Sequence, residues 1–455
     1  MNNDIFQIKE ITPEEENILN AFRKDTVNRV DFVISMYEMI NRSKFGVSSI
    51  SIDGQWGSGK TFFVKMLMDL IIVKTKSSKL TSYQNELSKI EEIVNLSESK
   101  IIPLYYDAWE NDLMSEPILS LIYSICKQTG TDSKIVKDIE EISKTMTKHF
   151  GHFLLKILST FTAIPDLSAL ADSICKFFNS NEPFIPVINT EELKNNINEL
   201  LEKILNKTNK PIVIFIDELD RCKPTFAIQL LESIKHYFFN EKILFVFSVN
   251  IEELQHSIRS IYGQGFDATR YLDRFFNIRF NLPQVDIKNF LEKEFLVNTY
   301  SDTLTSVILG LSEIYDLQLR EIIKFNNQVH FVSNCPYYDS HDDDKTNNGY
   351  AFTSNILIPL AICLKFKDQS KFHDFITGKG EEILRDLFSY DLIKKIYTFY
   401  FNNNEENLSD DILLLRLIQA YQFIFSKKRD EIRFGKITFN EKCFKIFNNK
   451  VSLLG

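Results

Sequence analysis

Residues 54–61 constrain the fold of this chain more than any other segment. They read Gly-Gln-Trp-Gly-Ser-Gly-Lys-Thr and match the pattern G-x-x-x-x-G-K-[ST] in full. Glycines at these places let a backbone wrap closely around phosphate oxygens, because no Cβ atom stands in the way. Strand-like alternation precedes the pattern over 47–52, and helical periodicity follows it over about 60–74. This order predicts a phosphate-binding loop that joins a strand to the N-terminus of a helix.

Further apolar runs predict the rest of a sheet. Residues 211–216 and 243–249 are continuous apolar runs, which are typical of parallel strands buried on both faces. Residues 101–106 and 276–282 are weaker strand candidates, and Pro103 is an objection to the first because proline cannot donate to a sheet ladder. Helical segments separate these runs. The alternation predicts an α/β fold with a doubly wound, mostly parallel sheet.

The pattern changes along the chain and predicts two domains, 1–284 and 285–455. The strand signal fades after Pro283, so the second domain is expected to be mainly helical. Within the first domain, helices are expected to fill an insertion at about 116–205. A polar, glycine-containing loop is expected at 336–350.

The first helix is expected to cover residues 12–43. Thr12 is a candidate N-cap, Pro13 suits the first helical position, and Glu15 completes a capping box. Apolar residues then recur at steps of three and four and give one apolar stripe, at Val27, Val30, Val33, Met36 and Ile40.

Charge and cysteine content favour a globular cytoplasmic protein. Among 455 residues, 53 are Lys or Arg and 62 are Asp or Glu, which leaves a net charge of −9. This balance argues against a surface that coats nucleic acid. The six cysteines show no C-x-x-C spacing, so reduced, buried thiols are expected rather than a zinc or redox site. No basic region followed by an apolar core is visible at the N-terminus, so no secretory signal is expected.

One segment resembles a membrane element in composition. Residues 150–178 are rich in Leu, Ile, Phe and Ala, but Pro165 and four charged residues interrupt them. No uncharged apolar run reaches the roughly 18 residues that a spanning helix needs. We expect a buried or interfacial helical hairpin and no transmembrane segment, with a membrane-surface element or a partner-binding hairpin as alternatives.

The phosphate-binding loop implies a set of metal and catalytic residues. Lys60 should reach the β- and γ-phosphates of ATP, and the Thr61 hydroxyl should ligate Mg²⁺. Asp217 and Glu218 follow the 211–216 strand at its carboxyl end, where α/β sheets place ligands. Asp217 suits the metal, and Glu218 suits a base that polarises the attacking water. Consecutive residues of a strand point in opposite directions, so both can serve only if the backbone turns there.

Two assignments are less constrained by the pattern. Asn250 follows the 243–249 strand and is a candidate for contact with the γ-phosphate; a turn-forming asparagine is the alternative. Charge on the transition state requires a cation, and Arg274 is taken as the catalytic candidate, with a surface salt bridge as the alternative. The arginines near the sheet are Arg221, Arg270, Arg274 and Arg279.

Together, these motifs resemble the KAP family of P-loop NTPases over about residues 20–284. The matching segments are 54–61, Tyr106 to Glu110, Phe215 to Cys222, Leu231 to Lys235, Tyr271 to Phe276, and the pair Leu282-Pro283. The resemblance implies an ATPase fold with an extra strand between the two that carry the phosphate loop and the acidic pair. Similar bacterial proteins are linked with phage exclusion.

The chain departs from the family pattern at three places. Asp107 stands where the family usually has Asn, and Asn250 where Asp is common. Many relatives carry transmembrane helices where this chain has the interrupted stretch 150–178. Nearby, Trp109 is expected to be a core aromatic, whereas Asp107 could support a metal or a nucleotide-bound water. The run His341 to Asp344 is expected to be solvated rather than metal-binding.

The sequence therefore predicts an ATP-hydrolysing regulatory NTPase that works by conformational switching. ATP and Mg²⁺ are the expected ligands, with self-association or a protein effector as the expected partnership. A nucleotide-dependent scaffold with little turnover, and a nucleic-acid-stimulated ATPase, are the alternatives. The expected nucleotide-binding residues are Gly54, Gln55, Trp56, Gly57, Ser58, Gly59, Lys60, Thr61 and Asn250.

Overall fold

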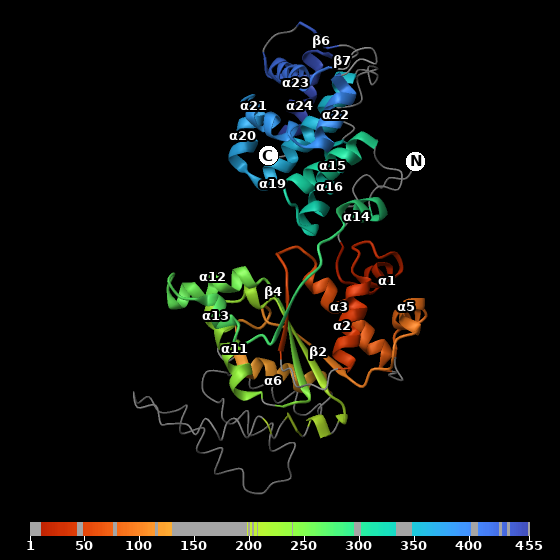
Figure 1. Ribbon diagram of the computed structural model, residues 1–455, viewed down its shortest axis with the longest axis vertical. Coiled ribbons are helices and arrows are strands. Elements are labelled where there is room, and N and C mark those ends of the chain that lie inside the picture. Colours follow the sequence, from red (N-terminus) through yellow and green to blue (C-terminus); the bar gives the residue numbers. More distant parts are fainter. Residues whose placement is uncertain are drawn as a thin grey trace. The chain divides into compact units, whose positions relative to one another are not determined.

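The computed structural model forms two compact units (Figure 1). One comprises the described residues of 13–25 and 29–283, and the other comprises residues 11–12, 26–28 and the described residues from 284 onward. The predicted hairpin at 150–178, the run 341–344 and most of the predicted insertion at 116–205 lie outside the described residues. The structure describes residues 11–42, 49–75, 80–113, 117–129, 198, 201–202, 204–206, 208–238, 240–294, 302–333, 348–401, 408–426, 430–434 and 437–453.

The first unit is built on a five-stranded sheet in the order β2-β3-β4-β1-β5. Every neighbouring pair is parallel, so the predicted doubly wound α/β fold is confirmed. β4 lies between β1 and β3, which is the extra strand that the family resemblance implied. β2 lies at the sheet edge, where Pro103 is tolerated. The strands are β1 (Ser49–Asp53), β2 (Ile102–Asp107), β3 (Ile212–Asp217), β4 (Ile243–Val249) and β5 (Ile278–Asn281).

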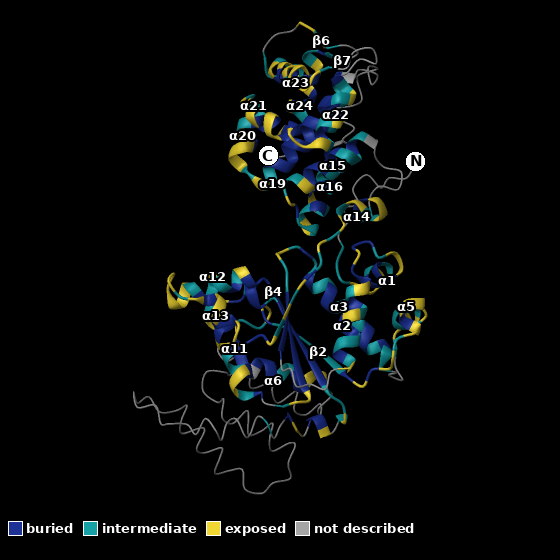
Figure 2. Ribbon diagram, in the orientation of Figure 1, coloured by how far each residue is buried: buried dark blue, intermediate teal, exposed yellow. Residues whose placement is uncertain are grey.

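Helices cover both faces of this sheet (Figure 1), and its central strands are buried (Figure 2). Alternate residues of a strand face opposite layers. Val213 and Phe215 of β3 share a core with α2 and α3, whereas Ile214 and Ile216 share a core with α6, α11 and α12. Strands β3 and β4 are therefore buried on both faces, as their continuous apolar sequences predicted. These helices are α2 (Val30–Arg42), α3 (Lys60–Lys74), α6 (Pro117–Gln128), α11 (Pro224–Tyr237) and α12 (Ile251–Tyr262).

The prediction of one helix over 12–43 is wrong, because the segment forms two helices. α1 (Glu15–Lys24) ends at Asp25, whose backbone is left-handed with a φ of 43°. The Asp25 carboxylate then accepts hydrogen bonds from the backbone N–H groups of Arg29 (2.8 Å) and Val30 (3.1 Å). This carboxylate satisfies N–H groups that the start of α2 leaves unpaired. The sequence did not predict this break, because the apolar stripe continues across it.

The predicted capping box at the start of this segment is also wrong. Glu14, not Thr12, occupies the N-cap position of α1, and its side chain makes no capping hydrogen bond. Glu15 and Glu16 lie in the first turn, where negative charge is favourable beside the positive end of the helix dipole.

The second unit is mainly helical, as predicted, and includes one short hairpin that the sequence did not predict. Strands β6 (Ile432–Phe434) and β7 (Ile437–Phe439) pair antiparallel. Their three-residue lengths are too short to show a periodicity. The helices are α14 (Ile287–Glu294), α15 (Asp302–Ile314), α16 (Leu319–Ser333), α18 (Asn348–Phe352), η2 (Thr353–Leu357), α19 (Ile358–Lys367), α20 (Gln369–Ile376), α21 (Glu381–Phe388), α22 (Asp391–Phe401), α23 (Asp410–Phe425) and α24 (Glu441–Ser452).

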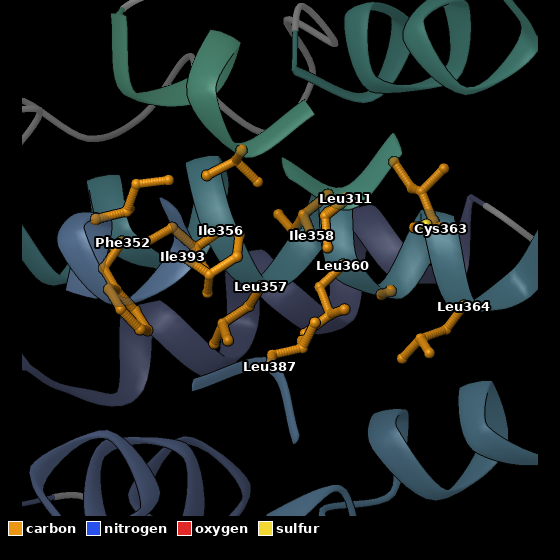
Figure 3. Packing of buried hydrophobic residues seen from close by; sticks show 14 of the residues in the cluster. Leu311, Phe352, Ile356, Leu357, Ile358, Leu360, Cys363, Leu364, Leu387 and Ile393 are labelled. Atoms are coloured by element: carbon orange, nitrogen blue, oxygen red, sulfur yellow. The ribbon is translucent and has the colours of Figure 1, made fainter. Parts of the chain in front are cut away.

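One helical run of the second unit has the length and composition of a membrane span. It covers Gly349–Lys367, and 67% of its most apolar window is buried inside the structure. Figure 3 shows its side chains Ile356, Leu357, Leu360 and Leu364 packed among neighbouring helices. Burial of this kind is expected of a central core helix. Among the described residues no other helix meets the same criteria.

The cysteines that the structure describes are buried thiols outside any disulfide, namely Cys126, Cys222, Cys363 and Cys443. Burial raises the pKa of the Cys126 and Cys363 thiols to about 12. They are therefore uncharged at neutral pH and pack as small apolar groups, as the sequence predicted.

Four short helices complete the described part of the first unit. They are α4 (Ser82–Leu87) and α5 (Glu91–Val94) before β2, η1 (Leu219–Arg221) after β3, and α13 (Ala268–Leu272) before β5. The capping box that failed at Thr12 is found instead at Thr81 and Gln84, where α4 begins. Of these elements, η1 is the one that shapes the candidate site, because it follows the acidic pair.

Candidate active site

The 54–61 loop joins the carboxyl end of β1 to the N-terminus of α3, as predicted. Gly57 and Gly59 have φ values of 81° and 92°, which residues with a Cβ rarely adopt. The Lys60 ammonium donates hydrogen bonds to the carbonyl oxygens of Gly54 (2.7 Å) and Gln55 (3.3 Å). Burial lowers the pKa of Lys60, although the nearby carboxylates oppose this shift. The loop therefore encloses a buried cation at a helix N-terminus, which suits an anionic ligand.

The acidic pair lies beside this loop. The backbone turns at Glu218, whose φ is 61°, so that Asp217 and Glu218 both reach the same end of the sheet. One Glu218 carboxylate oxygen lies 3.4 Å from the Thr61 hydroxyl, which donates to it. Asp217 is 1% exposed. Hydroxyl and carboxylate oxygens are ligands that Mg²⁺ prefers, and here they converge.

An ion pair holds the other oxygen of the Glu218 carboxylate. Arg221 lies 2.5 Å from it, and the Arg221 guanidinium also lies 5.6 Å from the centre of the Trp109 ring. Burial raises the pKa of Glu218, while the positive charge of Arg221 opposes the shift. A carboxylate with a raised pKa is better suited to accept a proton from water than an ordinary glutamate.

Trp109 is 52% exposed, so the prediction that it is a core aromatic is wrong. It lies in the turn after β2, the edge strand of the described sheet. Asp107, two residues earlier, is opposite Asp217 in the β2–β3 register. Burial raises the pKa of the Asp107 carboxyl, and its Oδ1 accepts the backbone N–H of Glu110. Asp107 therefore adds a second carboxyl group beside Asp217.

Trp56 links the phosphate loop to the segment after β3. Its indole N–H donates to a carboxylate oxygen of Asp220 over 2.5 Å. The Trp56 side chain is 46% exposed, whereas Asp220 is buried. The sequence predicted Trp56 only as a nucleotide-binding residue of the loop, and not as a partner of Asp220. A contact with a residue 164 positions away leaves no local signal.

Asn250 caps α12. Its Oδ1 accepts the backbone N–H groups of Glu252 (3.1 Å) and Glu253 (3.4 Å), which agrees with the turn-forming alternative. The adjoining residue Val249 accepts the Gly54 N–H through its carbonyl oxygen, so the segment borders the phosphate loop. Contact between Asn250 and the γ-phosphate stays a prediction, and it would fall to the side-chain Nδ2.

Arg274 lies at the opposite end of the sheet from the phosphate loop. The residue after it, Phe275, accepts a hydrogen bond from the Ser49 hydroxyl at the start of β1, whereas the loop follows Asp53 at the end of β1. The Arg274 guanidinium is exposed and lies 4.7 Å from the centre of the Tyr271 ring. A catalytic role toward the nucleotide of its own chain is therefore wrong. Of the four candidate arginines, Arg221 is the one that contacts the acidic pair.

Arg29 contacts the backbone of the phosphate loop through hydrogen bonds that the sequence did not predict. One nitrogen donates to the Ser58 carbonyl oxygen over 2.7 Å, and two others donate to the Pro283 carbonyl oxygen over 2.9 and 2.6 Å. Arg29 is 4% exposed, and burial lowers its pKa to about 10, so it remains protonated at neutral pH. Its place inside a predicted helix gave no reason to assign it to the loop.

Tyr105 holds Asp217 in place. Its hydroxyl donates to Asp217 Oδ2 over 3.1 Å, while Asp217 Oδ1 accepts the Glu218 N–H over 3.0 Å. The Lys65 ammonium lies 3.2 Å from the centre of the Tyr105 ring, where the negative face of the ring attracts it. Both Asp217 oxygens thus have fixed directions before any metal binds.

Replacing Tyr105 with phenylalanine should raise the Mg²⁺ concentration needed for half-maximal ATP binding by about tenfold, because loss of a supporting hydrogen bond typically costs 10–100-fold in metal affinity. The ring beneath Lys65 is retained. Mg²⁺ titration at fixed ATP measures the effect. Tyr106→Phe is the matched control, because the Tyr106 hydroxyl donates to Ser120 on the other face of the sheet. Equal effects of the two changes would refute a specific role for Tyr105.

Comparison with known proteins identifies the family of this chain. No curated protein matches the chain. A solved structure of the Aeropyrum pernix ORC2 protein, in ADPNP–ADP complexes, is 12% identical and covers 100% of this chain and 98% of that chain. Its TM-score is 0.31. The model of the KAP family P-loop domain matches residues 30–335, which extends beyond the predicted boundary at 284. This match covers two thirds of the chain, and the protein belongs to the KAP family of P-loop NTPases.

Proposed function

We propose that this protein binds ATP with Mg²⁺ and hydrolyses it. The proposal rests on one contact: the Thr61 hydroxyl lies within hydrogen-bond distance of the Glu218 carboxylate. This contact shows that the phosphate loop and the acidic pair lie side by side. Thr61 and Asp217 would hold the metal ion, which neutralises phosphate charge when it is bound. Glu218 would orient and polarise the attacking water.

The residues present fit both ligands. The loop offers backbone N–H groups and the N-terminus of α3 to the phosphates, and Lys60 adds a buried positive charge. Lys60 is held on the carbonyl oxygens of Gly54 and Gln55, so its position is set before a ligand arrives. Asp217 is likewise fixed through both carboxylate oxygens. Such preorganisation lowers the cost of assembling the site.

A regulatory role is the second part of the proposal. ATP binding and hydrolysis would switch the conformation of the protein, through self-association or a protein effector. A cytoplasmic role in bacterial anti-phage defence or signalling is what kinship with the KAP family suggests. A neighbouring copy could supply Arg274 as a finger, and this stays a prediction. The alternatives are a nucleotide-dependent scaffold with little turnover and an ATPase stimulated by DNA or RNA.

Replacing Lys60 with alanine should abolish measurable ATP binding and turnover, because the phosphates lose their buried cation. The two tryptophans of the chain, Trp56 and Trp109, are half-exposed, and Trp56 lies in the loop itself, so intrinsic fluorescence can report binding. Lys74→Ala is the matched control. It removes a lysine at the far end of α3 whose ammonium also donates to carbonyl oxygens.

Equal ATP binding and turnover by the wild type and Lys60→Ala would contradict the proposal. Tight ATP binding without Glu218-dependent hydrolysis would favour the scaffold. Stimulation of turnover by added DNA or RNA would favour the nucleic-acid alternative over a switch that responds to protein partners.

A further inference from the structure

Arg221 contacts Glu218 through both its backbone and its side chain. Its guanidinium lies 2.5 Å from the Glu218 carboxylate, and its backbone N–H donates to the Glu218 carbonyl oxygen over 3.1 Å. Both side chains are largely shielded from water, with 25% of Arg221 and 15% of Glu218 exposed. Solvent ions screen a partly buried ion pair less than a surface pair. The contact therefore restricts the direction in which the Glu218 carboxylate points.

Two tryptophans from distant segments contact the short helix η1, in which Arg221 lies. Trp56 of the phosphate loop donates its indole N–H to Asp220, and the Trp109 ring centre lies 5.6 Å from the Arg221 guanidinium. The negative face of an aromatic ring attracts a cation, so Trp109 favours the observed position of Arg221. Helix η1 is thus fixed on one side by the phosphate loop and on the other by the turn after β2.

The two oxygens of the Glu218 carboxylate have different partners. The Thr61 hydroxyl donates to Oε1 over 3.4 Å, which is long for a hydrogen bond between oxygens, whereas Arg221 lies beside Oε2. In the proposed function, Thr61 turns its hydroxyl away from Glu218 to hold a metal ion. Oε1 is then free to accept a hydrogen bond from water, while Arg221 still holds Oε2.

We infer that Arg221 is a positioning residue, which holds the Glu218 carboxylate so that Oε1 faces the attacking water. Trp109 in turn holds Arg221. The inference rests on the proposed function, in which Glu218 is the base, and adds two residues that set the rate of hydrolysis through it. Direct contact of Arg221 with the γ-phosphate is the competing role.

Arg279 offers a matched control. Its guanidinium lies 2.7 Å from Asp273 and 5.6 Å from the centre of the Phe276 ring, so it combines an ion pair with an aromatic contact as Arg221 does. Both partners precede β5, at the amino end of the parallel sheet, whereas the phosphate loop lies at the carboxyl end. Replacing Arg279 with methionine therefore removes an equivalent set of contacts at a distance from the site.

Steady-state turnover and ATP binding give the first test. Arg221→Met should lower kcat about ten- to a hundredfold, as expected for a misplaced catalytic group, and should leave the Kd for ATP within about threefold. Arg221→Lys should recover part of kcat, because lysine keeps the charge but not the planar shape of the guanidinium. Trp109→Ala should lower kcat about two- to fivefold. Arg279→Met should leave kcat within about twofold.

A double-mutant cycle with Glu218→Gln tests whether Arg221 acts through Glu218. In the Glu218→Gln background, Arg221→Met should change single-turnover hydrolysis less than about twofold, because the base that Arg221 positions has already been removed. Acrylamide quenching of tryptophan fluorescence, measured without nucleotide, reports the contact between Arg221 and Trp109. Arg221→Met should increase the quenching by uncovering the indole, and Arg279→Met should not.

An equal fold-loss from Arg221→Met in the wild type and in Glu218→Gln would overturn the inference, because Arg221 would then act independently of the base. A kcat that Arg221→Met leaves unchanged or raises, or an equal loss in Arg279→Met, would also overturn it. Unchanged quenching in Arg221→Met would overturn the role of Trp109. Failure of the proposed function is distinct, because it would show as a wild type that hydrolyses ATP no faster than Lys60→Ala does.

Discussion

Replacing Glu218 with glutamine should lower ATP turnover by at least about a hundredfold while ATP affinity stays within a few-fold of the wild type. Glutamine keeps the size of the side chain and can still contact Thr61, but it cannot accept a proton from the attacking water. Single-turnover hydrolysis of ATP, together with a binding titration, separates the two effects. Accumulation of an ATP-bound protein is the expected result.

Glu110→Gln serves as the control, because Glu110 is an exposed carboxylate in the turn just after β2. It should leave turnover within about twofold. The wild-type rate should fall with decreasing pH through a pKa above the usual 4.5 of glutamate, because burial raises the pKa of Glu218 and only the ionised carboxylate is a base. Turnover by Glu218→Gln equal to that of the wild type would show that another group activates the water.

The second large effect is on stability. Replacing Arg29 with methionine should destabilise the first unit by about 2–4 kcal/mol, because the Ser58 and Pro283 carbonyl oxygens would lose a charged donor. A loss of this size lowers the melting temperature by roughly 5–10 °C. ATP affinity should fall as well, since Ser58 belongs to the phosphate loop. Thermal denaturation, with and without ATP, measures both consequences.

Arg23→Met is the control for Arg29. Arg23 pairs with Glu86 over 3.3 Å, but both side chains are nearly half exposed. Removal of such a surface pair should cost less than about 1 kcal/mol. Equal melting temperatures of the Arg29→Met and Arg23→Met variants would show that the Arg29 hydrogen bonds do not stabilise the loop.

The sequence was most informative where local chemistry is decisive. The apolar strands β3 and β4 could be placed because burial on both faces favours apolar residues at nearly every position. The phosphate loop could be placed because it needs glycine at positive φ, as Gly57 and Gly59 show. The sequence also indicated a turn at Glu218, because two successive carboxylates can reach one site only if the backbone turns between them. The left-handed backbone of Glu218 provides this turn.

What remained hidden depends on contacts between distant segments. Arg29 donates to residues 29 and 254 positions away, and no periodicity signals such bonds. Arg274 lies close in sequence to strand β5. The parallel register of β1 and β5 shows that it lies at the amino end of the sheet, whereas the phosphate loop lies at the carboxyl end. In each case tertiary structure, rather than residue type, decides the role.

A crystal structure with Mg²⁺ and a non-hydrolysable ATP analogue tests the central claim most directly. The account predicts that the triphosphate lies against the backbone of residues 54–61, with the metal ion between the Thr61 hydroxyl and Asp217 and with Glu218 facing the γ-phosphate. A nucleotide bound elsewhere on the chain, or a metal ion that contacts neither Thr61 nor Asp217 directly or through water, would contradict it.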